Sequence, residues 1–150
     1  MKLNFEISID ASLETVWSAF DNSDNIGRWQ QNFQSHTRLS GAPGKVGSVA
    51  ELRFKEKGKI VVLTETITER RDKQFLAARY ESAHGRATIV NRFEKVDDNT
   101  TRWSSWCNFT YTGFMRLLAP FVSSAIRKRT EGAMQRFKLM VETDKAGASA

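Results

Sequence analysis

Apolar residues recur at helical spacing in the C-terminal part of the chain. Between Phe114 and Glu142 most of them lie three, four or seven positions apart, on one stripe of a helix with about 3.6 residues per turn. The stripe consists of Leu118, Val122, Ala125, Ile126, Ala133, Met134, Phe137 and Met140. Because Pro120 lacks an N–H and is tolerated in a first turn, we expect the main helix to begin near it, with Phe114–Leu118 as a separate turn or a kinked lead-in. A helix of this length needs a large apolar surface against which to pack.

The rest of the chain is dominated by strand patterns. Lys2–Asp10 alternates strictly between apolar and polar residues, as a half-buried strand does. Later segments alternate or are rich in β-branched residues, and short turn-forming segments separate them. They are Ala50–Phe54, Ile60–Glu69, Phe75–Ser82, Arg86–Val96 and Thr100–Thr112, and a further strand is expected to begin at His36–Leu39. Strands joined by such short turns pair antiparallel.

Two short helices are predicted after the first strand. Ser12 fits an N-cap, and the helix that follows has an apolar side. A second short helix is predicted over Asn25–Phe33, with Trp29 on its apolar side. The chain is therefore predicted to be of the α+β class, with a curved antiparallel sheet of about six to seven strands wrapped around the long C-terminal helix. Residues 1–144 would form one domain, and residues 145–150 a flexible tail.

Composition excludes several classes of protein. A length of 150 residues with 40% hydrophobic and 27% charged residues is ordinary for one globular domain. No segment approaches the roughly 20 apolar residues of a membrane span, and the N-terminus lacks the apolar core of a secretory signal. We therefore expect a cytoplasmic protein.

Motifs for metals and nucleotides are missing. The lone Cys107 excludes a disulfide within the chain, and His36 and His84 fall at predicted strand ends or turns. Neither belongs to a metal-ligand spacing, so no metal and no cofactor is predicted. The Gly-rich segment Gly41–Gly47 lacks both the P-loop ending and the GxGxxG spacing of a dinucleotide site.

Charge is uneven along the chain. The net charge is +6, and residues 113–150 carry seven Lys/Arg against three Asp/Glu. A basic helix can contact phosphates or an anionic membrane, or it can be an ordinary solvated face. No base-stacking motif accompanies it, so nucleic acid is not an expected partner.

Four segments together resemble the START-like (SRPBCC) superfamily of helix-grip proteins, which includes polyketide cyclase/dehydrase-like and Bet v 1-like proteins. They are the opening strand with its short helix (IDASLETVWSAFDN), the Trp of the second helix (IGRWQQNF), the Gly-rich loop (GAPGKVGS) and the C-terminal helix. A Pro common in the family near Ala11 is absent. The resemblance implies a helix-grip fold with a ligand cavity between sheet and helix. Because the family includes binders, transporters and cyclases, its signatures transfer no catalytic residue.

Glu65 is the most informative polar residue in the strands. It shares one strand face with Val61, Leu63 and Ile67. If this face points inward, the Glu65 carboxylate could act as an acid or base or anchor a ligand. The opposite phase, with Ile60, Val62 and Thr64 inward, would place Glu65 in solvent, and the alternation fits both phases.

Further cavity candidates come from neighbouring segments. Arg79 and Asn91 have the same ambiguity of phase, and a buried Glu65–Arg79 pair is one of the arrangements that the pattern allows. Trp and Tyr combine an apolar body with one polar atom, which suits a pocket wall. The predicted ligand-binding set is Trp29, Glu65, Arg79, Asn91, Trp103, Tyr111, Leu118, Val122 and Ile126. Plain core packing is the alternative for each, and we expect it for Ala133–Met140.

These observations predict binding or transport of a small hydrophobic or amphipathic molecule, such as a lipid, quinone or aromatic polyketide. One alternative is an enzyme of the polyketide cyclase/dehydratase type, with Glu65 as the catalytic candidate. A second alternative is an interaction module that uses the basic face of the C-terminal helix.

Overall fold

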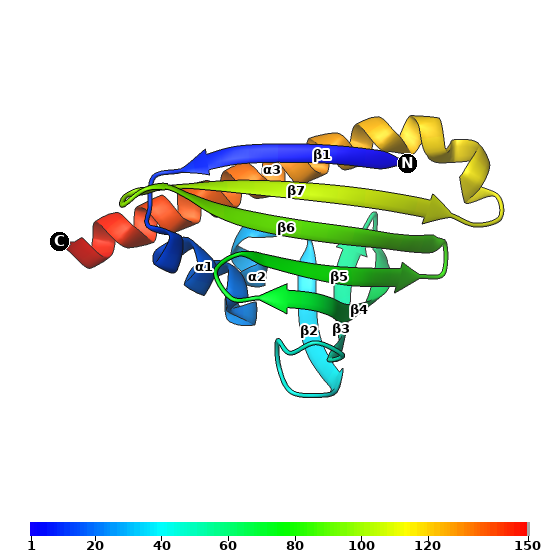
Figure 1. Cartoon of the computed structure of the whole chain (residues 1–150). Coiled ribbons are helices and arrows are strands. Elements are labelled where there is room, and N and C mark those ends of the chain that lie inside the picture. Colours follow the sequence, from blue (N-terminus) through cyan, green and yellow to red (C-terminus); the bar gives the residue numbers. More distant parts are fainter. Residues whose placement is uncertain (150) are drawn as a thin grey trace.

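Alternating strands assemble into one seven-stranded antiparallel sheet with the order β1-β7-β6-β5-β4-β3-β2. The computed structural model describes residues 1–149. The strands are β1 (Lys2–Ile9), β2 (Phe33–Ser40), β3 (Val49–Glu56), β4 (Lys59–Arg71), β5 (Phe75–Ser82), β6 (Gly85–Asp97) and β7 (Thr100–Tyr111). The sheet curves and twists, so that β2 and β3 cross the direction of β1 and β7 steeply (Figure 1). This confirms the predicted α+β helix-grip fold.

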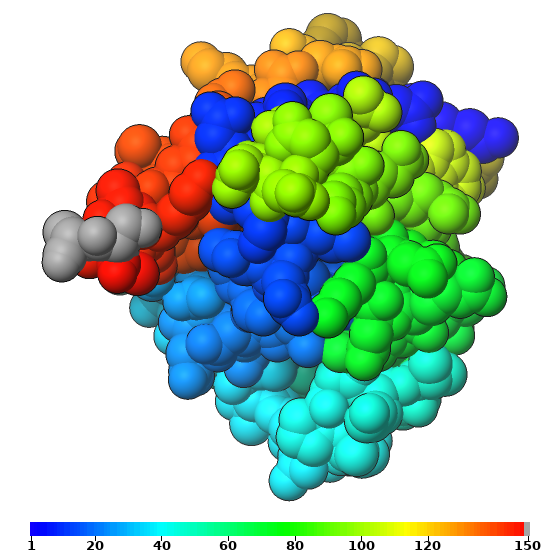
Figure 2. Space-filling view, turned by 60° about the vertical axis from the view of Figure 1, so that its left-hand side comes forward, coloured from blue at the N-terminus to red at the C-terminus, as the bar shows by residue number. Residues whose placement is uncertain are grey.

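The helices cover the concave side of this sheet. The long helix α3 (Met115–Ser149) runs along it, and the short helices α1 (Leu13–Asp21) and α2 (Ile26–Trp29) lie together at one end, joined by a 3₁₀ turn at Ser23–Asn25 (Figure 1). Ser12 caps α1 as predicted, since its Oγ accepts a hydrogen bond of 3.2 Å from the Thr15 amide. In Figure 2, α1 (blue) covers this end of the molecule between the C-terminal part of α3 and the β6–β7 turn.

The second short helix ends earlier than predicted. It stops at Trp29 instead of Phe33, because Asn32 has a φ of 65°, in the left-handed region that an α-helix does not use. Phe33 instead opens β2. Its ring packs edge-on against Phe54 of β3, with 5.8 Å between ring centroids.

The long helix begins before Pro120. The amides of Arg116 and Leu117 donate to the carbonyls of Gly113 and Phe114, which starts the helix at Met115 and places Pro120 inside it. Proline has no N–H for the carbonyl four residues earlier, and this is a cause of helix bending. The first turns of α3 accordingly run at an angle to its long body (Figure 1).

The predicted tail at residues 145–150 is helical as far as Ser149. Lys145 Nζ donates a 3.0 Å hydrogen bond to the Asp10 carbonyl, which ties this part of α3 to the end of β1. Residue 150 lies outside the described residues.

An aromatic cluster fills the space between sheet and helices beside α1 and α2. Phe137 of α3 is fully buried at its centre, and its ring lies 4.9 Å from Trp103 and 5.3 Å from Trp29, both edge-on. The cluster comprises Trp17, Phe20, Trp29, Phe93, Trp103 and Phe137. Such aromatic contacts stabilise beyond the area they bury. The cluster therefore joins α1, α2 and α3 to the sheet.

We predict that Phe137→Ala lowers the free energy of unfolding by about 3–5 kcal/mol, because it leaves a cavity among rings that cannot fully collapse. Chemical denaturation followed by circular dichroism measures this. Leu139→Ala, two residues along the same helix and exposed, should change stability by no more than about 0.5 kcal/mol. Equal losses in both variants would contradict a core centred on Phe137.

Candidate functional site

A cavity of about 820 Å³ lies between the concave face of the sheet and α3. This volume is within the range of small-molecule sites, roughly 300–1,000 Å³. Most of its wall is apolar or aromatic. The lining includes Trp29 of α2, Leu52 and Phe54 of β3, Leu63 of β4, Ile89 of β6, Trp103 and Phe109 of β7, and Ile126, Ala133 and Met134 of α3. Small residues such as Ala50, Ala87 and Ser105 share this wall and leave room in front of them.

Three polar side chains meet on the β2–β5 side of the cavity. The Tyr80 hydroxyl donates a hydrogen bond of 2.6 Å to Glu65 Oε2. His36 Nε2 lies 3.9 Å from the other carboxylate oxygen, Oε1. All three residues line the cavity, and we refer to Glu65, Tyr80 and His36 as the polar trio.

Strand register brings the polar trio together. Glu65 on β4 is directly opposite Tyr80 on β5 and opposite Ala50 on β3. Side chains directly opposite each other on neighbouring strands lie on the same face, close enough to bond. His36 belongs to β2, one strand beyond β3. On β3, His36 is opposite Leu52 and Glu65 is opposite Ala50, two residues apart on the same face, so the two side chains meet diagonally across β3.

The polar trio changes the acidity of two of its members. The neighbouring Glu65 carboxylate raises the pKa of His36 above its ordinary value of about 6.5, and burial opposes this in part. Burial and the Glu65 charge raise the pKa of Tyr80 well above its usual value of about 10. Tyr80 is thus held as a neutral donor, and His36 is favoured as a cation beside the carboxylate.

Two polar atoms in the aromatic wall are buried without a hydrogen-bond partner among the described residues. They are the indole Nε1 of Trp29 and the hydroxyl of Tyr111. The neighbouring Trp103 differs, since its Nε1 donates 2.9 Å to Asn91 Oδ1. Buried polar groups are normally paired, and an indole N–H can only donate. Both atoms have almost no accessible surface, so an acceptor oxygen of a ligand would satisfy Trp29 only after neighbouring side chains move.

Cys107 lies on the cavity wall as a buried thiol. Burial raises its pKa, and the hydroxyl of Ser105, 3.7 Å from the sulfur, opposes this in part. A protonated thiol is a poor nucleophile. Cys107 therefore contributes shape and polarizability to the wall.

Six of the nine predicted site residues line the cavity: Trp29, Glu65, Asn91, Trp103, Tyr111 and Ile126. For Glu65, the structure selects the phase in which Val61, Leu63 and Ile67 share its inward face. Proximity to a ligand remains a prediction for each of these residues.

Three predicted residues lie elsewhere. Arg79 is on the outer face of β5, where its Nε donates 2.6 Å to Glu81, so the Glu65–Arg79 pair that the pattern allowed does not form. The register between β4 and β5 directs the side chain of Tyr80 into the cavity instead. Leu118 and Val122 are half-buried but do not line the cavity. They belong to the angled first turns of α3, and the cavity meets this helix only from Ile126 onward.

Sequence reasoning also missed residues that line the cavity. His36 was expected at a strand end, yet it lies within β2, which begins earlier than predicted. Ala133 and Met134 are buried in the core, as expected, and they also line the cavity. A signal existed for Tyr80: Arg79 and Glu81, opposite charges two residues apart on one strand face, are typical of an exposed face and place Tyr80 on the other.

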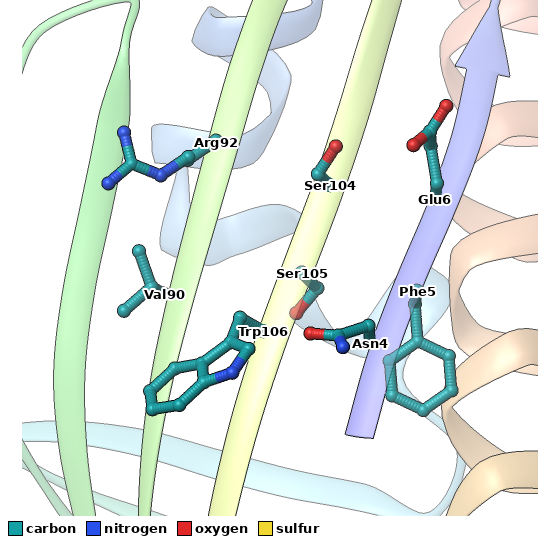
Figure 3. Close-up of a pocket in the computed structure, with 8 residues that line it drawn as sticks. All are labelled: Asn4, Phe5, Glu6, Val90, Arg92, Ser104, Ser105 and Trp106. Carbon is teal, nitrogen blue, oxygen red and sulfur yellow. The ribbon is translucent and has the colours of Figure 1, made fainter. Parts of the chain in front are cut away.

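A smaller pocket of about 250 Å³ lies on the opposite, outer face of the sheet (Figure 3). It spans β1, β7 and β6, with Arg92 at one side, Glu6 at the other and Trp106 between them. It contains none of the predicted site residues. Because it is small and lies on the outer face, it is a weaker candidate for a binding site than the much larger cavity.

In the part of the chain that the structure describes, no three His, Cys, Asp or Glu side chains come together as a metal site. Nor does any helix within residues 1–149 have the length and apolar character to cross a membrane.

Solved structures share this architecture. The aromatase/cyclase ZhuI from a Streptomyces species superposes with a TM-score of 0.81 at 11% identity, covering 95% of this chain and 93% of that one. A START superfamily protein from Mycobacterium smegmatis superposes with a TM-score of 0.78 at 13% identity, covering 95% of this chain and 97% of that one. A protein from Thermus thermophilus superposes with a TM-score of 0.79 at 16% identity, covering 96% of this chain and 99% of that one. At such low identity these similarities establish the fold alone.

Sequence comparison identifies the family. No curated protein matches this chain. The family described as "Polyketide cyclase / dehydrase and lipid transport" matches residues 1–142. Because this match spans nearly the whole chain, the protein belongs to the polyketide cyclase/dehydrase and lipid transport family.

Proposed function

We propose that the protein binds a small, largely apolar molecule in the cavity between the sheet and α3. The observation that carries this proposal is a cavity of about 820 Å³ with apolar and aromatic walls and one cluster of polar side chains. Burial of roughly 300 Å² of apolar ligand surface, at about 25 cal/mol per Å², would contribute roughly 7 kcal/mol before the costs of association. Apolar burial would therefore supply most of the affinity.

The polar atoms of the wall indicate the class of ligand. Once neighbouring side chains move, Trp29 Nε1 can donate to a carbonyl or ether oxygen, and the Tyr111 hydroxyl can donate or accept. Glu65 can accept from a ligand hydroxyl. A plain hydrocarbon chain would leave the two unpartnered atoms buried and unsatisfied, at a cost. Among lipids, quinones and aromatic polyketides, this favours ring systems that carry carbonyl or hydroxyl oxygens.

A second candidate is an enzyme of the cyclase/dehydratase type, and the polar trio supports it. Proton transfer next to a carbonyl needs a base, and loss of a hydroxyl needs an acid. The Glu65 carboxylate can take a proton, while Tyr80 and protonated His36 hold protons beside it. The aromatase/cyclase ZhuI shares the fold, which makes this chemistry compatible with the scaffold. Both candidates use the same cavity, so binding is the first property to test.

Binding is tested by native mass spectrometry together with a thermal-shift screen of phospholipids, quinones and aromatic hydroxyketones. We expect a one-to-one complex and a raised Tm for at least one class that carries ring oxygens. Ile126→Trp, which places a large ring in the cavity, should weaken that binding about tenfold or more, or about 1.4 kcal/mol. Ala125→Trp, at the adjacent exposed position, is the matched control and should bind normally. The proposal fails if no class raises Tm, or if both variants bind like the parent.

The enzyme candidate is tested at Glu65. Glu65→Gln and Tyr80→Phe should each lower kcat on a cyclisable β-keto aromatic substrate by about 100-fold or more, because each removes a proton acceptor or donor. Binding of the same compound should change far less. Glu81→Gln, a carboxylate on the outer face, should keep full turnover. Unchanged kcat in Glu65→Gln would exclude this residue as the base.

The pairing of His36 with Glu65 predicts a pH dependence. The raised pKa means that this pair stabilises the fold fully below a pH of about 6.5, and that the contribution is lost as pH rises through the raised value. NMR titration of the His36 ring should give a midpoint above 6.5 in the parent and in Glu81→Gln. It should give a lower midpoint in Glu65→Gln. A midpoint that is the same in all three proteins would show that Glu65 does not act on His36.

A further inference from the structure

Three large apolar side chains project into solvent where α3 begins. Phe114, Leu117 and Phe121 are 71%, 72% and 78% exposed. Leu117 and Phe121, four residues apart, lie on one side of the helix, and Phe114 is in the turn directly before it; we refer to the three as the apolar tip. A single exposed apolar residue is ordinary, but three such neighbours at one helix start mark an interaction surface.

The helix around the apolar tip carries only positive charge. Residues 113–130 contain four cations, Arg116, Arg127, Lys128 and Arg129, and no Asp or Glu. Arg129 is paired with Glu56, and Arg127 lies 3.8 Å from Glu131. Arg116 and Lys128 are exposed and take part in no ion pair among the described residues. Lys128 follows Phe121 by seven residues, so it continues the same side of the helix.

The apolar tip lies at the end of the molecule opposite α1 (Figure 1). Here the amide of Thr112 donates 3.1 Å to the His84 carbonyl, which joins the end of β7 to the β5–β6 turn. Tyr111 and His84 both line the cavity, so the cavity reaches this end. The exposed Arg86 of β6 adds a cation at this end. The residue opposite it on β5 is the acidic Glu81.

We propose that the apolar tip and its cations are a docking surface for an anionic phospholipid bilayer. Phe114, Leu117 and Phe121 would enter the interfacial layer, and Arg116 and Lys128 would contact lipid phosphates. Large aromatic and aliphatic side chains beside cations are the combination that binds such surfaces without spanning them. The docked protein would place one end of its cavity beside the bilayer, in which apolar ligands dissolve. Docking itself does not require the ligand.

A second copy of the chain fits this surface less well. A stable interface buries about 800 Å² on each partner, more than three side chains provide. A symmetric contact would also bring two groups of unpaired cations together, which is unfavourable. An anionic lipid surface complements both the apolar residues and the charge.

Vesicle co-sedimentation tests the proposal. Phosphatidylcholine vesicles are compared with vesicles in which phosphatidylglycerol replaces a third of the lipid, at low and at high salt. We expect partitioning to be about tenfold stronger on the anionic vesicles, and weaker at high salt. The double variant L117S/F121S should lose binding, and R116Q/K128Q should lose only the preference for anionic lipid. Leu139→Ser is the matched control, because Leu139 is an isolated apolar residue on the same helix with 66% exposure, and it should bind like the parent.

Three outcomes would overturn the proposal: no binding to anionic vesicles, the same loss in Leu139→Ser as in L117S/F121S, or a parent protein that is dimeric in solution and becomes monomeric in L117S/F121S. Thermal shifts with soluble ligands, measured without vesicles, separate this proposal from the cavity function. L117S/F121S should retain those shifts, and Ile126→Trp should retain vesicle binding. Loss of one property alone therefore identifies which proposal has failed.

Discussion

The packing of aromatic rings between the sheet and α3 is the interaction on which the rest of the structure depends. Rings from α1, α2, β6, β7 and α3 meet around Phe137, and they hold the helix away from the strands at that end. Beyond the cluster, small residues on the wall do not refill the gap; they are Ala50, Ala87, Ser105 and Ala133. A cavity follows from this contrast, because bulky residues set the spacing and small residues leave it open.

The same geometry explains where the chemistry lies. An antiparallel sheet directs alternate side chains inward, so one polar residue on each of β2, β4 and β5 is enough to build a cluster in an apolar wall. Tyr80 donates a hydrogen bond to Glu65 and His36 lies beside the same carboxylate, whereas Trp29 and Tyr111 keep polar atoms without partners among the described residues. The cavity thus has a preformed polar cluster in an apolar wall, and the exposed start of α3 lies at one end of it.

Helices and strands with a clear spacing of apolar residues could be predicted from the sequence. Which face of a strand points inward was harder to predict. The alternation of β1 and the stripe of α3 each have one apolar side, which allowed the sheet and the gripping helix to be predicted. On β4 both faces carry β-branched residues, so only pairing with β3 and β5 decides that Glu65 points inward. Arg79 was misplaced for the same reason. His36 could not be predicted in the polar trio, because its partner Glu65 lies two strands away, diagonally across β3.

The most direct test of the central claim uses the indole N–H signals of the tryptophans, followed by ¹H–¹⁵N NMR during titration with a soluble naphthoquinone, an aromatic hydroxyketone or a short-chain lipid. Trp29 faces the cavity, and its Nε1 has no partner among the described residues, while Trp106 lies on the outer face of the sheet. A ligand in the cavity should shift the Trp29 signal and leave Trp106 unchanged. A shift of Trp106 alone, or no shift with any of these compounds, would contradict the account.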